Sequence, residues 1–178
     1  MIRICVFCGA RPGRDEAYLH VARDAARAIA ARGYGIVYGG GRVGMMGALA
    51  DAALAAGAEV IGVIPEALAA AEIAHSGVTQ LHVVESMHAR KAMLAQLSDA
   101  FIALPGGIGT MDEFFEALTW RQLRIHDKPI GLLNSDGYYD PLVTLLDTML
   151  AHGLLPPATR AFVTTRRSID EILDAFAL

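Results

Sequence analysis

Residues 100–118 read AFIALPGGIGTMDEFFEAL, and this stretch decides the fold that the sequence predicts. Its first five residues are apolar and typical of a buried strand, and residues 110–123 have the pattern of a helix. The glycine-rich turn between them lets backbone N–H groups approach a phosphate, and the start of a helix favours a negative charge. We expect Glu113 in the first turn of that helix, beside the anion. The stretch therefore indicates chemistry on a phosphorylated small molecule.

The rest of the chain repeats this alternation of short apolar runs and alanine-rich helical stretches. Strands are predicted at residues 3–8, 35–38, 59–64, 80–84, 100–104, 129–133 and, from a weaker pattern, 162–164. Helices are predicted at residues 16–32, 45–56, 87–97, 110–123, 139–152 and 169–176. Strands that are apolar throughout belong to a parallel sheet with helices on both faces. We therefore predict a doubly wound, Rossmann-like α/β fold with a mainly parallel sheet, whose ligands bind at the carboxyl ends of the strands.

Length and composition point to one globular domain. A chain of 178 residues is long enough for one full core and short for two, so we predict a single domain over residues 1–178. Hydrophobic residues make up 54% of the chain, which argues against disorder. No apolar run reaches the roughly 18 residues of a membrane helix, and the opening MIRICV lacks the features of a signal peptide. We predict a cytoplasmic protein, with residues 65–77 forming a lid or a connecting helix near the ligand edge.

The charge of the chain limits its partners. A formal net charge of −4 argues against a general nucleic-acid coat, which needs a basic face. An anionic ligand then depends on local cations, and those near glycine loops are Arg11, Arg42, Arg90 and Lys91. Ser86 is predicted to cap a helix that carries Arg90 and Lys91 in its first two turns, where cations oppose the helix dipole. The pair indicates an anionic neighbour, either a phosphate or Glu113; a solvated basic pair is the alternative.

Glycine-rich loops also follow the first two predicted strands, at residues 9–13 and 39–47. In a parallel sheet these loops and residues 106–110 meet at one edge, where they can line a single pocket. Gly39, Gly41 and Gly44 match the GxGxxG fingerprint of dinucleotide binding. The acid expected about 20 residues later is missing, since Glu59 and Glu66 both stand at unsuitable places. A nicotinamide or flavin cofactor is therefore disfavoured.

Cys5 and Cys8 form a CxxC pair inside the first predicted strand. Residues three apart in a strand point to opposite faces of the sheet. A redox pair normally lies at a helix start, and a zinc site needs further ligands that are not spaced here. We interpret the two cysteines as buried thiols, and we expect neither a metal nor an organic cofactor.

Arg90 and Lys91, followed by PGGIGTMDE at 105–113, resemble the LOG ("Lonely guy") family of phosphoribohydrolases. Further matching segments follow in the family's order along nearly the whole chain: CVFCG at 5–9, VYGGG at 37–41, VIGVIP at 60–65, MH at 87–88, TW at 119–120 and HDKP at 126–129. Their joint occurrence is far more specific than one glycine loop. The resemblance implies cleavage of cytokinin riboside 5′-monophosphates to the free base and ribose 5-phosphate.

The resemblance also implies roles for individual residues. Arg90 and Glu113 are then catalytic. The residues then expected to bind the nucleotide are Glu72, Lys91, Gly106, Gly107, Ile108, Gly109, Thr110 and Thr119. A side chain at Gly107 or Gly109 is expected to intrude on the phosphate or to force an unfavourable backbone angle. Members of this family have often been labelled lysine decarboxylases, but no lysine here stands in a recognisable pyridoxal-phosphate setting.

The chain departs from the family's common pattern at two places. Ala10 and Arg11 stand where small hydroxyl residues are usual, and Met93 stands where an acid is frequent. The first departure lies in a glycine loop and is placed to alter phosphate or base contacts. Neither departure involves the expected catalytic pair.

Two functions of different class follow from these patterns. The favoured one is hydrolysis of nucleoside 5′-monophosphates, AMP included; the alternative is a non-catalytic carrier of a nucleotide or a nucleotide-like cofactor on the same fold. We also expect a homodimer, because the helices at 87–97 and 110–123 carry more apolar surface than one sheet face covers. The resemblance implies a dimer as well. Arg121 or Arg124 is then a candidate to reach into the partner's pocket.

Overall fold

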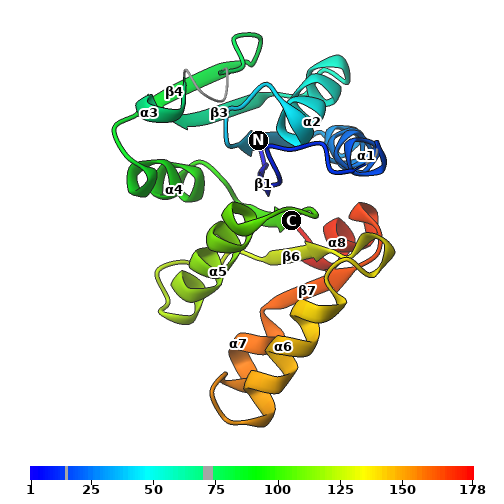
Figure 1. The fold of residues 1–178 in the computed structure, drawn as a ribbon, viewed down its shortest axis with the longest axis vertical. Helices are drawn as coiled ribbons and strands as arrows, with labels where there is room; N and C mark the ends of the chain where they lie inside the picture. The colour runs from blue at the N-terminus through cyan, green and yellow to red at the C-terminus, as the bar shows by residue number, and fades with distance from the viewer. Residues whose placement is uncertain (15, 70–73) are drawn as a thin grey trace.

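A seven-stranded parallel sheet runs through the part of the chain that the computed structural model describes, residues 1–14, 16–69 and 74–178 (Figure 1). Its strands are β1 Arg3–Phe7, β2 Gly35–Tyr38, β3 Val60–Pro65, β4 Gln80–Val84, β5 Ala100–Ala103, β6 Ile130–Leu133 and β7 Val163–Arg166. They are ordered β4-β3-β2-β1-β5-β6-β7, and every neighbouring pair is parallel. The predicted doubly wound α/β fold is confirmed.

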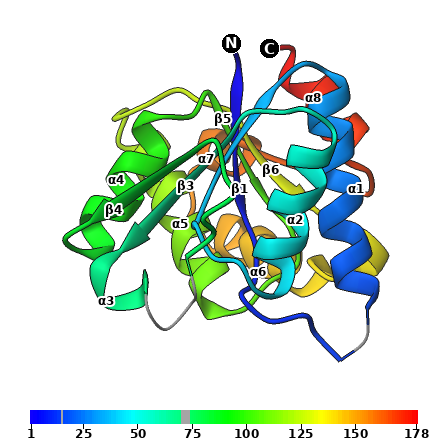
Figure 2. The same cartoon turned by 90° about the horizontal axis from the view of Figure 1, so that it is seen from above.

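Helices cover both faces of this sheet. They are α1 Ala17–Ala31, α2 Gly44–Ala55, α3 Glu66–Ala69, α4 Met87–Gln96, α5 Ile108–Gln122, α6 Asp140–Ala151, α7 Pro157–Ala161 and α8 Ile169–Phe176, with a 3₁₀ turn η1 at Ser135–Gly137. Figure 2 shows α1, α2 and α8 on one side of the sheet and α4 and α5 on the other. None of the described helices is both long and apolar enough to cross a membrane.

The two core layers follow from the period of two along each strand. In β1, Ile4 and Val6 pack with the α1, α2 and α8 side, whereas Cys5 and Phe7 pack with the α4, α5 and α6 side. Cys8 falls in the first of these layers, so the two cysteines are buried in different layers. Burial raises the pKa of both thiols, and they stay protonated at neutral pH. The interpretation as buried thiols is confirmed.

The predicted elements differ from the observed ones mainly at their ends. The largest shifts are of two residues: α5 begins at Ile108 rather than at residue 110, and β7 ends at Arg166 rather than at residue 164. η1 and α7 were not predicted, and α3 is the helical part of the interruption at 65–77. Residues 70–73 of that interruption lie outside the described residues. The single domain over residues 1–178 stays a prediction.

The order of the strands determines where a ligand can bind. β1 connects through α1 to β2 on one side of the sheet, whereas its other neighbour is β5. The chain thus leaves the carboxyl ends of β1 and β5 in different directions, which opens a crevice between them. The loops after β1, β2 and β5 are the three glycine-rich loops of the sequence.

Candidate active site

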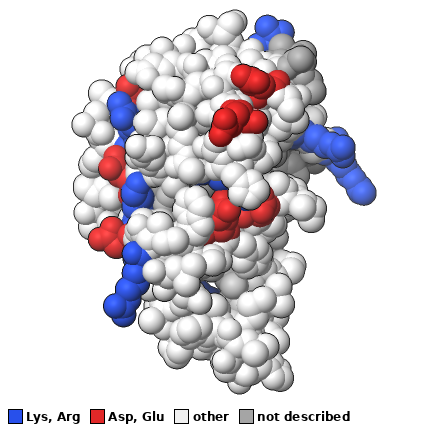
Figure 3. Space-filling view, turned by 90° about the vertical axis from the view of Figure 1, so that its left-hand side faces the viewer, with Lys and Arg blue, Asp and Glu red and all other residues white. Residues whose placement is uncertain are grey.

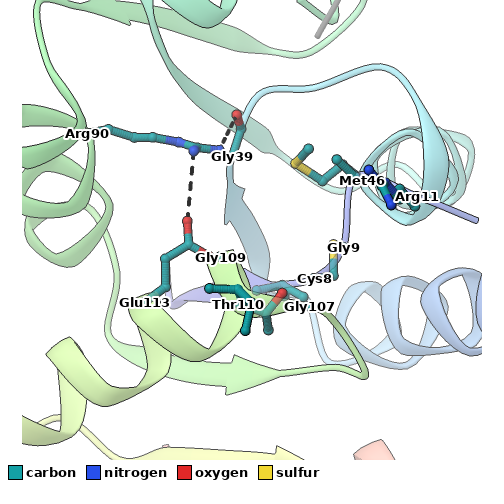
Figure 4. Close-up of a pocket in the computed structure, with 13 residues that line it drawn as sticks. Cys8, Gly9, Arg11, Gly39, Met46, Arg90, Gly107, Gly109, Thr110 and Glu113 are labelled. Carbon is teal, nitrogen blue, oxygen red and sulfur yellow. Dashed lines mark hydrogen bonds and ion pairs between the residues drawn. The ribbon is translucent and has the colours of Figure 1, made fainter.

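A pocket of about 530 Å³ lies in this crevice, between the three glycine-rich loops and the helices α2, α4 and α5 (Figure 4). This volume is within the range of roughly 300–1,000 Å³ that encloses small ligands. The expected gathering of the three loops at one edge is observed, since Gly9, Gly39 and Gly107 all line the pocket. Arg90 and Glu113 face each other at one end of it.

The start of α5 forms one wall of the pocket. Gly107 is the residue before the first helical turn, and among the described residues no side chain caps the N–H groups of that turn. Ile108, Gly109 and Thr110, which carry these groups, line the pocket. A Cβ atom built on Gly107 or Gly109 would meet no other atom within 4 Å, so open space lies over the uncapped end of the helix. An exposed helix start with room above it suits an anion.

Thr110 fixes the conformation of the loop in front of this helix. Its side chain is 3% exposed, and a Cβ atom on Gly106 would overlap its Oγ1 atom. The hydroxyl of Tyr138 donates a hydrogen bond of 2.6 Å to the carbonyl oxygen of Gly106 from the opposite side. Packing against Thr110 therefore requires glycine at 106, whereas glycine at 107 and 109 leaves open space that a ligand can occupy.

Arg90 is held by two backbone carbonyls, one inside β3 and one directly after β2. It lies in α4, whose first turn is capped by the Oγ atom of Ser86, and it is only 6% exposed. Its Nε atom donates to the carbonyl oxygen of Val63 at 3.1 Å, and Nη2 donates to that of Gly39 at 2.8 Å. The planar guanidinium is thereby fixed at the pocket wall with Nη1 toward Glu113 (Figure 4).

Glu113 lies one turn deeper than the sequence suggests. It is the sixth residue of α5 and belongs to the second turn, so the expectation of a first-turn carboxylate is wrong. Its side chain is 12% exposed, and Oε1 lies 3.9 Å from Nη1 of Arg90. This separation gives electrostatic attraction but exceeds a direct hydrogen bond. The guanidinium of Arg90 and the carboxylate of Glu113 are therefore close enough to contact the same part of a ligand.

Lys91 connects α4 to α5 instead of lining the pocket. Its Nζ atom lies 3.1 Å from a carboxylate oxygen of Asp112 and 3.1 Å from one of Glu116. Burial lowers the pKa of Lys91, but hydrogen bonds to Asp112 and Glu116 outweigh this effect and raise it above its usual value. Lys91 is therefore charged at neutral pH and paired with acids of the neighbouring helix.

Two other described residues that were expected to bind the nucleotide, Gly106 and Thr119, do not line this pocket; Gly106 lines a smaller neighbouring hollow. Thr119 is exposed in the fourth turn of α5, away from the pocket lining. Glu72 lies outside the described residues. The pocket also includes Cys8, Met46 and Gly39, which the sequence did not indicate as binding residues. Cys8 and Gly39 directly follow β1 and β2, and Met46 lies at the start of α2, so their place at the carboxyl ends of the strands could have indicated them.

The loop after β2 is fastened to the segment that precedes β4. The N–H of His75 donates to the carbonyl oxygen of Gly40 at 3.0 Å, and its Nε2 atom lies 3.0 Å from Oδ1 of Asp51 in α2. The N–H of Gly77 donates to Nδ1 of the same ring at 3.2 Å. Because Nδ1 accepts this bond, Nε2 carries the proton and donates to Asp51. His75 thus fixes the loop that carries Gly39.

Comparison with known proteins identifies relatives of this chain. A family model described as "possible lysine decarboxylase" matches residues 46–176. A cytokinin riboside 5′-monophosphate phosphoribohydrolase of Rhodococcoides fascians is 51% identical over 97% of this chain and 87% of its own length. The chain belongs to the LOG family. A LOG-family cytokinin riboside 5′-monophosphate phosphoribohydrolase of Arabidopsis thaliana is 43% identical over 96% of this chain and 80% of its own.

Solved structures extend the likeness of this LOG-family chain at the level of the fold. The X-ray structure of TM1055 has a TM-score of 0.77 at 21% identity and covers 99% of each chain. The molybdenum cofactor carrier protein of Chlamydomonas reinhardtii has a TM-score of 0.71 at 24% identity, covering 98% of this chain and 95% of the carrier. At these identities the structures share the fold alone.

Proposed function

We propose that this LOG-family protein hydrolyses the N-glycosidic bond of nucleoside 5′-monophosphates, AMP among them, to the free base and ribose 5-phosphate. The observation that carries the proposal is the placement of Glu113 and Arg90 beside a pocket whose wall is the uncapped start of α5. The names of the relatives that are 43–51% identical support the same activity. We propose AMP as the simplest member of the substrate class.

The start of α5 would bind the 5′-phosphate. Its backbone N–H groups and the partial positive charge of the helix end favour an anion of this size. Thr110 adds a hydroxyl at the same place, although most of its surface is buried by the loop. Binding energy at the phosphate would then orient the sugar for reaction.

The length of the first helical turns would place the ribose in front of Glu113. Glu113 lies five positions after Ile108 in α5, which corresponds to about 7.5 Å along the axis at about 1.5 Å per residue. A phosphate at the helix start and an anomeric carbon near the carboxylate lie comparably far apart in a ribose 5-phosphate. The single helix α5 would therefore hold both ends of the substrate's sugar phosphate.

Cleavage would build positive charge on the ribose ring as the C–N bond breaks and the oxygen of water bonds to the anomeric carbon. Glu113 would stabilise this charge or orient and deprotonate the water, and the leaving base takes up a proton. Arg90 would hold the carboxylate in position and contact the ribose or the base side of the substrate. Its hydrogen bonds to the carbonyl oxygens of Val63 and Gly39 keep its guanidinium in place even without a ligand.

We further propose a cytoplasmic homodimer. Large apolar side chains are exposed at the end of α5 and just after it: Leu123 is 62% exposed and Ile125 is 63% exposed. The side of the molecule that carries α4 and α5 is largely uncharged between small groups of acidic and basic side chains (Figure 3). Nearby, the guanidinium carbon of Arg121 lies 4.3 Å from the centre of the Phe162 ring. Arg121 and Arg124 line a surface hollow there, where a second copy would bring its own side chains.

A panel of nucleoside 5′-monophosphates tests the activity, with chromatographic detection of the free base. We expect base and ribose 5-phosphate in equal amounts from AMP and from N6-isoprenylated AMP. Tight binding of a nucleotide without release of base would instead favour the carrier function. Such an outcome would contradict the proposed hydrolysis.

A further inference from the structure

Four cations stand near the glycine loops in the sequence, and the structure gives each a different environment. Arg90 is engaged by two carbonyls and faces Glu113, and Lys91 is paired with two acids. Arg42 is exposed and does not line the pocket. Arg11 does line it, at the mouth opposite the Arg90 and Glu113 end (Figure 4). Within the described part of the chain, Arg11 has no hydrogen-bond or ion-pair partner.

The backbone at Arg11 packs closely against the start of α2. Gly44 has a φ of +60°, and a Cβ atom there would overlap the carbonyl oxygen of Ala10 and lie 2.8 Å from the nitrogen of Arg11. The same loop lies beside the phosphate loop, since a Cβ atom on Gly9 would be in ordinary contact with the Cα atom of Gly106, at 3.8 Å. The Arg11 side chain thus leaves a backbone that is packed between the start of α2 and the phosphate loop.

The side chain of Arg11 has room to change its direction. Arg11 also lines a second hollow of about 160 Å³, which shares Gly9 and Gly107 with the main pocket. Tyr18, Met45 and Tyr138 form walls of this hollow. Arg11 therefore borders two open spaces that Gly107 also lines, directly before the uncapped start of α5.

The charges around the pocket leave a phosphate incompletely neutralised. A phosphate monoester carries about −1.5 to −2 charges at pH 7, whereas a helix start supplies about +0.5. Arg90 and Glu113 have opposite charges and lie 3.9 Å apart, so together they add little. One further positive charge is needed near the start of α5, and Arg11 is the pocket-lining side chain that can supply it.

We propose that Arg11 is a phosphate-recognition residue, which turns onto the 5′-phosphate at the start of α5 and sets the preference for phosphorylated over unphosphorylated substrates. Its fork of N–H donors suits two phosphate oxygens at once. The proposal rests on the proposed function, because that function places the phosphate there.

The experiment compares Arg11→Ala, Arg11→Ser and Arg11→Lys with the wild type and with Arg42→Ala as a matched surface control. Binding of ribose 5-phosphate is measured by calorimetry, and kcat and KM are measured for AMP and for adenosine. We expect Arg11→Ala and Arg11→Ser to weaken ribose 5-phosphate binding and to raise KM for AMP by about tenfold or more, as for a charge-assisted hydrogen bond. The kcat for AMP and the low activity on adenosine stay within about threefold, Arg11→Lys keeps part of the effect, and Arg42→Ala matches the wild type.

Several outcomes overturn the role of Arg11. Unchanged ribose 5-phosphate binding in Arg11→Ala does so, as does an equal loss for AMP and adenosine or an equal loss in Arg42→Ala. Thermal melts of all variants show whether the fold is intact, which we expect because Arg11 is exposed. If the wild type releases no base from AMP, the proposed hydrolysis is refuted but the role of Arg11 is not. Ribose 5-phosphate binding by the wild type and the Arg11 variants still tests that role. A wild type that binds no ribose 5-phosphate refutes both.

Discussion

The guanidinium of Arg90 occupies the space that a side chain on Gly39 would need. Its Nη2 atom donates a hydrogen bond of 2.8 Å to the carbonyl oxygen of Gly39, and a Cβ atom on that glycine would overlap Nη2. The same Cβ atom would lie 2.9 Å from the sulfur of Met46. The glycine that begins the GxGxxG pattern is therefore explained by a protein contact with Arg90.

Gly39→Ala should displace Arg90 and lower kcat/KM for AMP by about 100-fold or more, because the arginine loses its hydrogen bond to Gly39 and its position beside Glu113. Kinetics in the wild-type and Arg90→Ala backgrounds check this. In the Arg90→Ala background the glycine substitution should cost little further activity, since the residue that it displaces is already gone. Independent, additive losses would show that Gly39 acts through something other than Arg90.

Glu113→Gln should lower kcat for AMP by at least about 100-fold while AMP binding, measured by calorimetry, stays within a few-fold. The carboxylate lies beyond the first turn of α5 and is not part of the proposed phosphate site. Glu85→Gln is the control, because Glu85 is exposed and does not line the pocket. Wild-type turnover in Glu113→Gln, or an equal loss in the control, would remove Glu113 from the chemistry.

Arg90→Lys should recover little of the activity lost in Arg90→Ala. Nε and Nη2 donate to the carbonyl oxygens of Val63 and Gly39, and Nη1 points toward Glu113. A lysine ammonium is a single compact charge and cannot make all three contacts at once. Comparison of kcat/KM for the two variants checks this. Full recovery by lysine would mean that the site needs only a positive charge at this position.

Gly109→Ala should raise KM for AMP by about tenfold without lowering the melting temperature. The new methyl group has open space on the protein side, and alanine is a better helix former than glycine. The expectation of an unfavourable backbone angle at Gly107 and Gly109 is wrong, because neither residue has a positive φ. Gly106→Ala is the contrasting variant, in which a clash with Thr110 should lower the melting temperature. An unchanged KM in Gly109→Ala would argue against a phosphate at this helix start.

The unmodified loop should also distinguish substrates. Adenosine should be cleaved at least about tenfold less efficiently than AMP, since a charge-assisted contact to phosphate contributes roughly 1.5–3 kcal/mol. The measurement is kcat/KM for both compounds at one pH and one salt concentration. Equal values would be incompatible with phosphate recognition by this loop.

Light scattering should give twice the chain mass of 18.9 kDa at micromolar concentration. Replacing both Leu123 and Ile125 with Asp should yield a folded monomer, because the two side chains are exposed in the single chain and contribute little to its core. Leu145→Asp, on α6 and 46% exposed, is the control that should stay dimeric. A fully active wild-type monomer would contradict the proposed dimer.

The fold was predictable because local pattern and global architecture agree along this chain. The central strands are almost entirely apolar, and helical stretches alternate with the strands, so the doubly wound sheet followed directly. The start of α5 was placed late because glycine at 107 provides no capping side chain, and capping residues are what sequence rules look for. That shift moved Glu113 from the second turn to the first.

The contacts of the site were less predictable, because they join residues that are distant in the chain. Nothing near Lys91 in the sequence indicates that it forms ion pairs from α4 with Asp112 and Glu116 of the neighbouring helix α5. The glycine at 39 matched a dinucleotide fingerprint locally, whereas its closest neighbour is Arg90 on α4. Both cases depend on how helices and loops pack, which a local pattern does not encode.

The link from Lys91 to Asp112 and Glu116 fastens the helix that carries Arg90 to the helix that carries Glu113. The distance between the two reacting side chains is thereby constrained from outside the pocket, in addition to the hydrogen bond that holds Arg90 to Gly39. Positions of the loops after β1 and β2 other than Gly39 and Arg11 can then vary with little effect on this distance. An enzyme engineer who wished to change the accepted base would vary those positions and leave α4, α5 and Gly39 intact.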